Sequence, residues 1–288
     1  VKARVVAEAI KQLLKDNDNV LIMGHRFADL DSLGSSVGFA MICKALDKQA
    51  KIVMSSKTTL AMPLAKHLAS NGINNLIIEP DEADDYVNDN TLLVILDTHR
   101  KSFLEYPELF DSIGKVVVID HHRKTVDHID KAVIFYHEPN ASSASEMVTE
   151  LIQYIDMDID MPKACAEALM SGITLDTKNF VMKTGVRTFE AAAFLREYNA
   201  VCIWEEMLLK KAFGKSFSPQ RTVLLAKSIT SCVHLCERFI STSLSAVWIK
   251  VLKPSTSALE KVVVIAWFIS PQRIKFLCFP LSNPINLC

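Results

Sequence analysis

One short segment carries an imidazole and two carboxylates at a spacing that suits a metal ion. Residues 24–31 place His25, Asp29 and Asp31 where an apolar strand gives way to a helix. Carboxylate oxygens bind hard divalent cations such as Mg²⁺ and Mn²⁺, and an added imidazole shifts the preference toward Mn²⁺. The segment alone is a weak signal, because the same side chains could merely cap a helix that starts near Ser32.

Two further polar groups follow apolar strands, which strengthens the metal interpretation. Asp97 ends one such run, and Asp120, His121 and His122 follow another. Adjacent ionisable groups at a strand end are costly to bury without a counter-ion, so a pair of cations is the simplest explanation. Asp176, just past an apolar helix, offers one more carboxylate. Together these side chains could hold two metals about 3.5–4 Å apart, an arrangement that activates water in phosphoryl transfer.

The hydrophobic pattern predicts the elements that must position these side chains. Helical periodicity predicts helices over residues 5–14, 32–45, 62–70, 142–155, 162–173 and 186–198. Short, nearly continuous apolar runs predict strands over residues 20–23, 51–54, 76–78, 92–96 and 116–119. This alternation predicts an α/β fold, a mostly parallel sheet flanked by helices. Ligands collect at the carboxyl ends of such strands, so we expect His25, Asp97 and Asp120 to converge there.

The last third of the chain has a different composition. Of the 8 glycines only Gly214 lies beyond residue 199, whereas five of the 7 cysteines do. We therefore expect a catalytic domain over residues 1–199 and a smaller, divergent or degraded region over 200–288. Candidate strands in that region are residues 246–252 and 262–269.

The overall composition limits the partners and the compartment. The chain has 288 residues, 50% of them hydrophobic, and a net charge of -1, so it should fold but offers no basic field for duplex nucleic acid. No apolar run approaches the ~20 residues that cross a bilayer. Seven scattered cysteines fit reduced thiols better than a disulfide framework, so we predict a cytoplasmic location.

Over residues 20–199 the chain resembles the DHH phosphoesterases. Within that family, the segments 25–31, 97–100 and 171–195 are most similar to the catalytic domain of GdpP-type cyclic-di-AMP phosphodiesterases. The resemblance implies hydrolysis of cyclic-di-AMP to the linear dinucleotide, by a water that two metals activate. The cofactors would be two Mn²⁺, with Mg²⁺ as the alternative. The partner would be a cyclic dinucleotide or a short oligonucleotide.

The resemblance also divides the metal ligands into two sets. His25 and Asp29 would hold one Mn²⁺, and Asp31, His121 and Asp176 would hold the second.

Three residues receive catalytic roles by the same resemblance. Asp97 would bridge both metals, and Asp120 would fix the tautomer of an imidazole from behind the ligands. His122 would contact the phosphate or donate a proton to the departing oxygen.

Four further residues are candidates for binding the substrate. Arg100 and Arg123 could contact phosphate oxygens, or could equally be surface residues that follow a strand. Ser142 and Ser143 could present hydroxyls and amides to an anion at a helix start, although an ordinary helix cap explains them nearly as well.

The chain departs from the family pattern in its last third. DHH proteins ordinarily carry a glycine-rich loop there that grips the substrate, and this chain has none. A divergent domain, a frameshifted or degraded sequence, or a cradle supplied by another chain would each account for this, and the abrupt change favours the second. GdpP-type proteins also carry upstream membrane helices, so we expect a fragment of a membrane-tethered parent, and a homodimer is compatible with it.

Other functions remain open at this point. The same superfamily contains oligoribonucleases and phosphoadenosine-phosphate phosphatases, which would use the same metal site. A catalytically weak fragment that only binds a nucleotide is a further alternative, because the glycine-rich loop is missing.

Overall fold

The computed structural model describes residues 2–155, 159–201, 246–252, 263–270 and 273–280. By its internal contacts the chain divides into two units, Val1–Lys215 and Ser216–Cys288. The predicted domain boundary at residue 199 stays a prediction.

The second unit contains a three-stranded antiparallel sheet. Its order is β7 (Ala246–Leu252), β8 (Val263–Ser270) and β9 (Arg273–Pro280). The two strands predicted from the sequence are therefore present, the second shifted by one residue.

The first unit is built on a six-stranded sheet in which every pair of neighbours is parallel. The spatial order is β3-β2-β1-β4-β5-β6. The strands are β1 (Asn19–Met23), β2 (Gln49–Val53), β3 (Ile77–Ile78), β4 (Thr91–Leu96), β5 (Lys115–Asp120) and β6 (Ile134–His137). The predicted α/β fold with a parallel sheet is confirmed. The sequence analysis missed β6, although residues 132–136 form an apolar run, and this edge strand is only partly buried.

Helices cover the sheet and account for most of the predicted helical segments. They are α1 (Lys2–Lys15), α2 (Leu30–Ala45), α3 (Met62–Ser70), α4 (Pro107–Ser112), α5 (Ala144–Ile155), α6 (Lys163–Asp176) and α7 (Val186–Glu197), with 3₁₀ turns η1 (Pro80–Tyr86) and η2 (Lys101–Phe103). The short α4, η1 and η2 were not predicted, since segments of three to seven residues have too few turns for a periodic signal.

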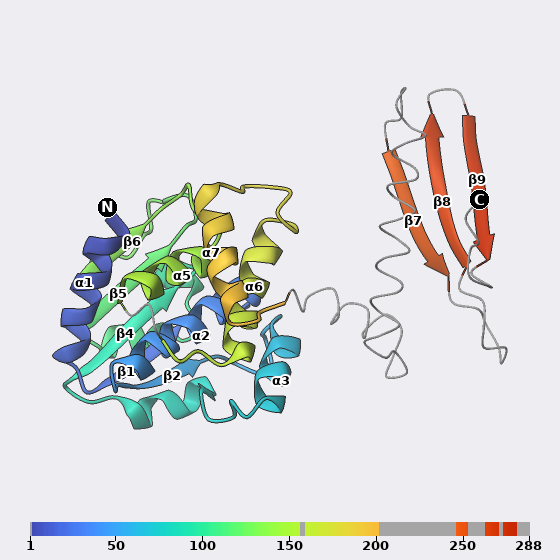
Figure 1. Ribbon diagram of the computed structural model, residues 1–288. Coiled ribbons are helices and arrows are strands. Elements are labelled where there is room, and N and C mark those ends of the chain that lie inside the picture. Colours follow the sequence, from blue (N-terminus) through green and yellow to red (C-terminus); the bar gives the residue numbers. More distant parts are fainter. Residues whose placement is uncertain (1, 156–158, 202–245, 253–262, 271–272, 281–288) are drawn as a thin grey trace. The chain divides into compact units, whose positions relative to one another are not determined.

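The alternation of side chains along each strand gives the sheet two separate hydrophobic cores. In β1, Val20 and Ile22 pack into the core that includes α1, α2, α5, α6 and α7, which lie together on one side of the sheet in Figure 1. Leu21 and Met23 face the opposite side, where they join Leu109 of α4. Both faces are thus covered, as near-continuous apolar strands require.

The strand order reverses between β1 and β4. From β1 the chain winds outward to β3, then returns to β4 beside β1 and winds outward to β6. The connections leave β1 and β4 in opposite directions, so a crevice forms outside the carboxyl ends of these two strands. Any ligand site of this unit is expected in that crevice.

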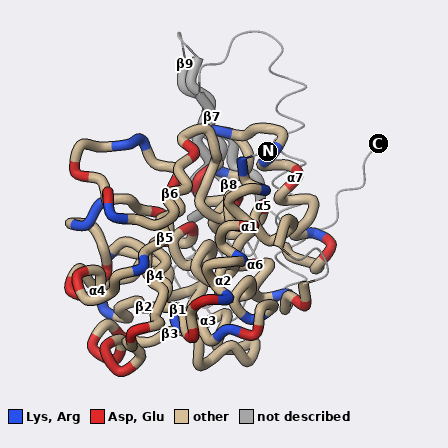
Figure 2. The backbone as a smooth tube through the Cα atoms, turned by 90° about the vertical axis from the view of Figure 1, so that its left-hand side faces the viewer, with Lys and Arg blue, Asp and Glu red and all other residues tan. Residues whose placement is uncertain are grey.

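The first unit shows no one-sided distribution of charged residues and no long apolar helix among its described residues. Blue and red segments are interspersed along its tube in Figure 2, so neither sign of charge covers the side shown. Among the helices that the structure describes, none combines the length and the apolar character that a bilayer crossing needs.

Candidate metal centre

All six predicted metal ligands meet at the carboxyl edge of the parallel sheet. His25 follows β1, Asp97 follows β4, and His121 follows β5. Asp29 is the residue before α2, Asp31 lies in its first turn, and Asp176 ends α6. They fall into two groups whose ligand atoms lie within 4.8 Å of one another: His25, Asp29 and Asp97, and Asp31, His121 and Asp176.

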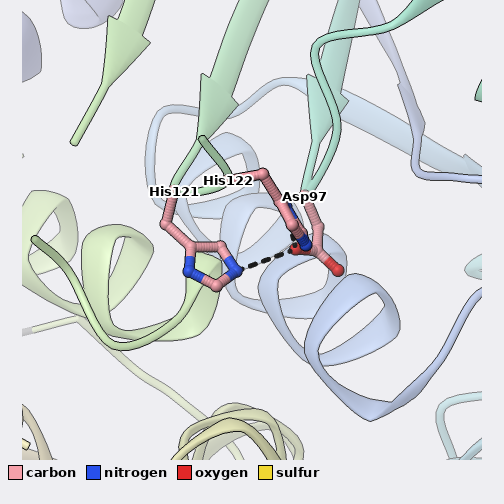
Figure 3. Close-up of side chains that lie close together, drawn as sticks. All are labelled: Asp97, His121 and His122. Carbon is pink, nitrogen blue, oxygen red and sulfur yellow. Dashed lines mark ion pairs between the residues drawn. The ribbon is translucent and has the colours of Figure 1, made fainter. Parts of the chain in front are cut away.

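Asp97 touches an imidazole from each group. One carboxylate oxygen lies 3.4 Å from His25 Nε2, and the other lies 3.4 Å from His121 Nε2. Figure 3 shows Asp97 with His121 and His122, and the second of these imidazoles also approaches Asp97, with Nδ1 at 3.6 Å from Oδ1. The position predicted to bridge the two groups is therefore central in the structure.

The distances within each group fit ligands that share a cation better than direct hydrogen bonds. His121 Nε2 lies 3.3 Å from Asp176 and 3.7 Å from Asp31, and His25 Nε2 lies 3.9 Å from Asp29. Oxygen and nitrogen ligands stand about 2.0–2.2 Å from a small divalent cation, so neighbouring ligand atoms separate by about 3 Å or more.

Two orphaned polar atoms supply an independent test of this fit. Asp97 Oδ1 and His121 Nε2 are both buried without a hydrogen-bond partner in the described structure. Buried polar atoms are almost always satisfied, and leaving one unpaired costs about 1–3 kcal/mol. A divalent cation between these atoms would satisfy both, so the residues present fit a metal.

The two aspartates of residues 24–31 stand at the very start of α2, one residue before it and one residue inside it. Asp29 is the N-cap of α2, and its Oδ1 accepts hydrogen bonds from the backbone N–H groups of Asp31 and Ser32. Asp31 already lies in the first helical turn and is buried. Capping and metal binding are therefore not alternatives here, because the cap leaves lone pairs free.

Asp31 has a second structural role at a distant helix. Its two oxygens accept hydrogen bonds from the N–H groups of Ala144 at 2.7 Å and Ser145 at 2.9 Å, the first residues of α5. The positive end of the α5 dipole thus faces a buried carboxylate, which stabilises the negative charge.

A glycine on α6 leaves the space that Asp31 needs. A Cβ at Gly172 would lie 2.2 Å from Ser145 Oγ and 2.6 Å from Asp31 Oδ1. Both distances are far inside van der Waals contact, so only glycine permits this packing. Sequence reasoning missed Gly172, since nothing near it in the chain indicates the neighbour that requires it.

Asp97 adopts an unusual backbone conformation. Its φ is 61°, in the left-handed region that costs most side chains energy but that aspartate and asparagine tolerate. Its N–H donates to the carbonyl of Ile119 on the neighbouring strand. From this turn the Asp97 carboxylate reaches His25 and His121.

Asp120 lies behind the ligands and orients two imidazoles. It accepts a hydrogen bond from His122 Nδ1 at 2.8 Å, and its other oxygen contacts His99 Nδ1. The backbone N–H of Thr125 donates to His99 Nε2, so the ring proton of His99 is on Nδ1 and points at Asp120. Sequence reasoning missed His99, although it stands two residues after Asp97.

His122 is more exposed than the ligands. Its side chain is 54% exposed, against 2% for His121. Because Asp120 accepts from His122 Nδ1, its Nε2 faces away from that carboxylate, and the hydrogen bond raises the pKa of the imidazole. His137 holds the same loop by donating from Nε2 to the His122 carbonyl at 2.5 Å.

Crowding shifts the pKa values of the carboxylic acids in both directions. Burial, together with the charges of Asp97 and Asp176, raises the pKa of Asp31 well above its ordinary value. Burial and the charge of Asp97 likewise raise the pKa of Asp176 to about 6. Burial opposes ionisation of Asp97 as well, but contacts with His121 and His25 outweigh it and lower the Asp97 pKa.

The imidazoles respond to the same charges. Burial alone would lower the pKa of His25, but the neighbouring carboxylates of Asp29 and Asp97 raise it to about 10. Burial alone would also lower the pKa of His121, but the carboxylates of Asp97 and Asp31 raise it to about 9. In the absence of a cation, the cluster therefore retains protons at neutral pH.

The predicted substrate contacts do not gather in the way that the ligands do. Arg100 is partly exposed and pairs with Asp127 at 2.9 Å, and Arg123 is exposed. Ser142 and Ser143 are fully buried. The Ser142 hydroxyl donates to Glu146, and the Ser143 hydroxyl accepts from the Glu146 N–H, so both stabilise the start of α5. Substrate binding by these four residues stays a prediction.

Comparison with known proteins gives one family and several relatives. Residues 19–173 match the DHH family, N-terminal domain. The chain is 40% identical over 217 residues to the cyclic-di-AMP phosphodiesterase PdeA of Listeria monocytogenes, and 39% identical over 217 residues to the cyclic-di-AMP phosphodiesterase GdpP of Bacillus subtilis. Each match covers 73% of this chain, and 33% and 32% of the two relatives, so the chain spans about a third of their length.

Among solved structures, the fold resembles an exopolyphosphatase-related protein from Bacteroides fragilis. The TM-score is 0.57 at 20% sequence identity, covering 80% of this chain and 65% of that one. At this identity the likeness concerns the fold.

Substituting Gly172 by alanine should destabilise the protein by about 1–3 kcal/mol, since the added methyl collides with Asp31 and Ser145. In a helix interior alanine is ordinarily better than glycine by about 1 kcal/mol, so a loss of stability isolates the steric effect. Chemical denaturation measures the change. Gly114→Ala is the matched control, because a Cβ there meets nothing within 4 Å. Equal stability of both variants would contradict the packing argument.

Mn²⁺ affinity should fall as the pH is lowered from 8 to 6. The pKa values of Asp31, Asp176, His25 and His121 are all raised, so protons occupy sites that the cation must take. Each displaced proton weakens binding by on the order of tenfold per pH unit. Calorimetry in buffers of different ionisation enthalpy counts the protons released. Binding that releases none and ignores pH would refute this linkage.

Proposed function

Because the chain belongs to the DHH family, we propose that it hydrolyses cyclic-di-AMP to the linear dinucleotide, using two divalent cations at the centre around Asp97. The observation that carries this proposal is the meeting of two ligand groups on Asp97, with orphaned buried atoms on both Asp97 and His121. A phosphodiester cleaved by water needs both an activated nucleophile and a stabilised leaving oxygen, and paired cations supply both.

The proposed ligands follow the two groups of the structure. His25 and Asp29 would hold one cation, Asp31, His121 and Asp176 the other, and Asp97 both. Mixed carboxylate and imidazole ligands favour Mn²⁺ over Mg²⁺.

The surrounding residues have separate tasks in this reaction. Asp97 is held at its central position by the left-handed turn after β4. Asp120, itself held by His99, keeps the Nδ1 proton of His122 engaged. The Nε2 side of His122 is then available to donate a proton to the departing 3′ oxygen or to hold a phosphate oxygen.

The substrate is proposed from the relatives. The two named above are cyclic-di-AMP phosphodiesterases at 40% and 39% identity, and this favours cyclic-di-AMP over the oligoribonuclease and phosphoadenosine-phosphate phosphatase alternatives. A fragment that only binds the nucleotide would use the same residues without turnover. A membrane-tethered parent, a homodimer and a cytoplasmic location stay predictions.

Asp97→Asn should lower the hydrolysis of cyclic-di-AMP by at least about a hundredfold, because it removes the charge shared by both ligand groups. Asparagine is preferred to alanine because it also tolerates the left-handed backbone of this position. Product formation with Mn²⁺ is followed by chromatography. Asp160→Asn, at a side chain that is 98% exposed, is the matched control and should keep full activity.

Two outcomes of the same assay would redirect the assignment. A wild-type chain that leaves cyclic-di-AMP intact and degrades short oligoribonucleotides would favour the oligoribonuclease function. Micromolar binding of cyclic-di-AMP with no product would favour the binding-only function.

A further inference from the structure

A cluster of two arginines and two phenylalanines stands on the surface beside the metal centre. The Arg26 guanidinium carbon lies 4.8 Å from the centre of the Phe27 ring and 5.8 Å from that of Phe103. The Arg100 guanidinium carbon lies 4.4 Å from the same Phe103 ring. We call these four residues the arginine cluster. The Phe103 ring thus lies next to two guanidinium groups.

Backbone contacts fix this cluster next to a predicted metal ligand. The Arg26 N–H donates to the Phe103 carbonyl at 2.9 Å, and His25 forms an antiparallel bridge with Leu104. Arg100 stands three residues after Asp97, in the segment that follows β4. The cluster is therefore tied to the ends of both β1 and β4, the two strands that border the crevice.

The cluster is exposed and incompletely neutralised. Phe27 is 46% and Phe103 40% exposed, and Arg26 is exposed as well. Arg100 pairs with Asp127. No carboxylate of the described residues lies within ion-pair distance of Arg26, so the nearby aspartates of the metal centre do not neutralise it. Large aromatic rings and a free guanidinium on a surface are typical of a binding site.

The charge balance of the metal centre indicates which part of the substrate the arginine cluster would bind. The four aspartates of the two ligand groups would be neutralised by two divalent cations. A cyclic dinucleotide carries two phosphates on one small ring, and only one of them is cleaved at the cations. The second, which must lie nearby, needs a positive group outside the metal centre.

We propose that Arg26 and Arg100, held against Phe103, bind the phosphate of the substrate that is not cleaved. This inference rests on the proposed function and names the substrate contacts of that site. Guanidinium groups suit it because they form paired hydrogen bonds with phosphate oxygens while their flat faces stack on aromatic rings. Phe103 acts as a positioning residue, since it sets where both guanidinium groups stand.

The test compares substrates with two phosphates and with one. The two-phosphate substrates are cyclic-di-AMP and the linear adenine dinucleotide with a 5′ phosphate, and the one-phosphate substrate is bis(4-nitrophenyl) phosphate. Arg26→Gln should lower kcat/KM for the first two by about ten- to a hundredfold, mainly through KM. It should change the third by less than about twofold, because the scissile phosphate makes no use of Arg26.

Three further variants serve as controls. Phe103→Leu should raise KM for the two-phosphate substrates only, whereas Phe103→Tyr, which keeps the ring, should retain the wild-type values. Arg4→Gln makes the same change at an exposed arginine of α1 and should alter nothing.

The results separate this inference from the proposed function. An equal loss on all three substrates, or none, overturns the role of Arg26. A wild-type chain that cleaves the linear dinucleotide but not the cyclic one refutes the proposed substrate, and the linear compound then decides the role of Arg26. Cleavage of neither two-phosphate compound overturns both.

Discussion

Burial of negative charge at one point of the molecule is the constraint on which the rest of this structure depends. Asp31, Asp97 and Asp120 are each at most 3% exposed, and the partly buried Asp176 stands beside them. Carboxylates so close together repel one another and lose hydration, so each needs a compensating partner. Asp31 finds backbone N–H groups at the start of α5, and Asp120 finds two imidazoles. Asp97 Oδ1 is buried without a hydrogen-bond partner, and a cation would supply the positive charge that it lacks.

The fold supplies these partners through its topology. The reversal of strand order between β1 and β4 leaves a crevice at the carboxyl edge of the sheet. His25 follows β1 and Asp97 follows β4, so each of the two strands that border the crevice is followed by a predicted ligand. Helices α2, α5 and α6 then close around the crevice from the face that carries the larger core. Gly172 allows α6 to approach closely enough for Asp176, at the end of the same helix, to reach the cluster.

The same edge separates two kinds of charged group. The side chains that face the crevice are mainly acidic and buried, which suits small hard cations. The arginine cluster lies outside them, exposed and held by aromatic rings. A substrate with two phosphates would meet cations at both places, one set bound by carboxylates and the other carried by the chain itself.

The sequence alone determined the α/β class, most helices and strands of the parallel sheet, and the identity of the residues that converge on Asp97. These follow from local patterns, since apolar runs define strands and the polar side chains after them share one edge of a parallel sheet. It could not determine the capping of α5 by Asp31, the contact of His99 with Asp120, the space at Gly172, or the approach of the Arg26 guanidinium to the Phe103 ring. Each of these joins segments that are distant in the chain, so only the tertiary register of helices, strands and loops decided them.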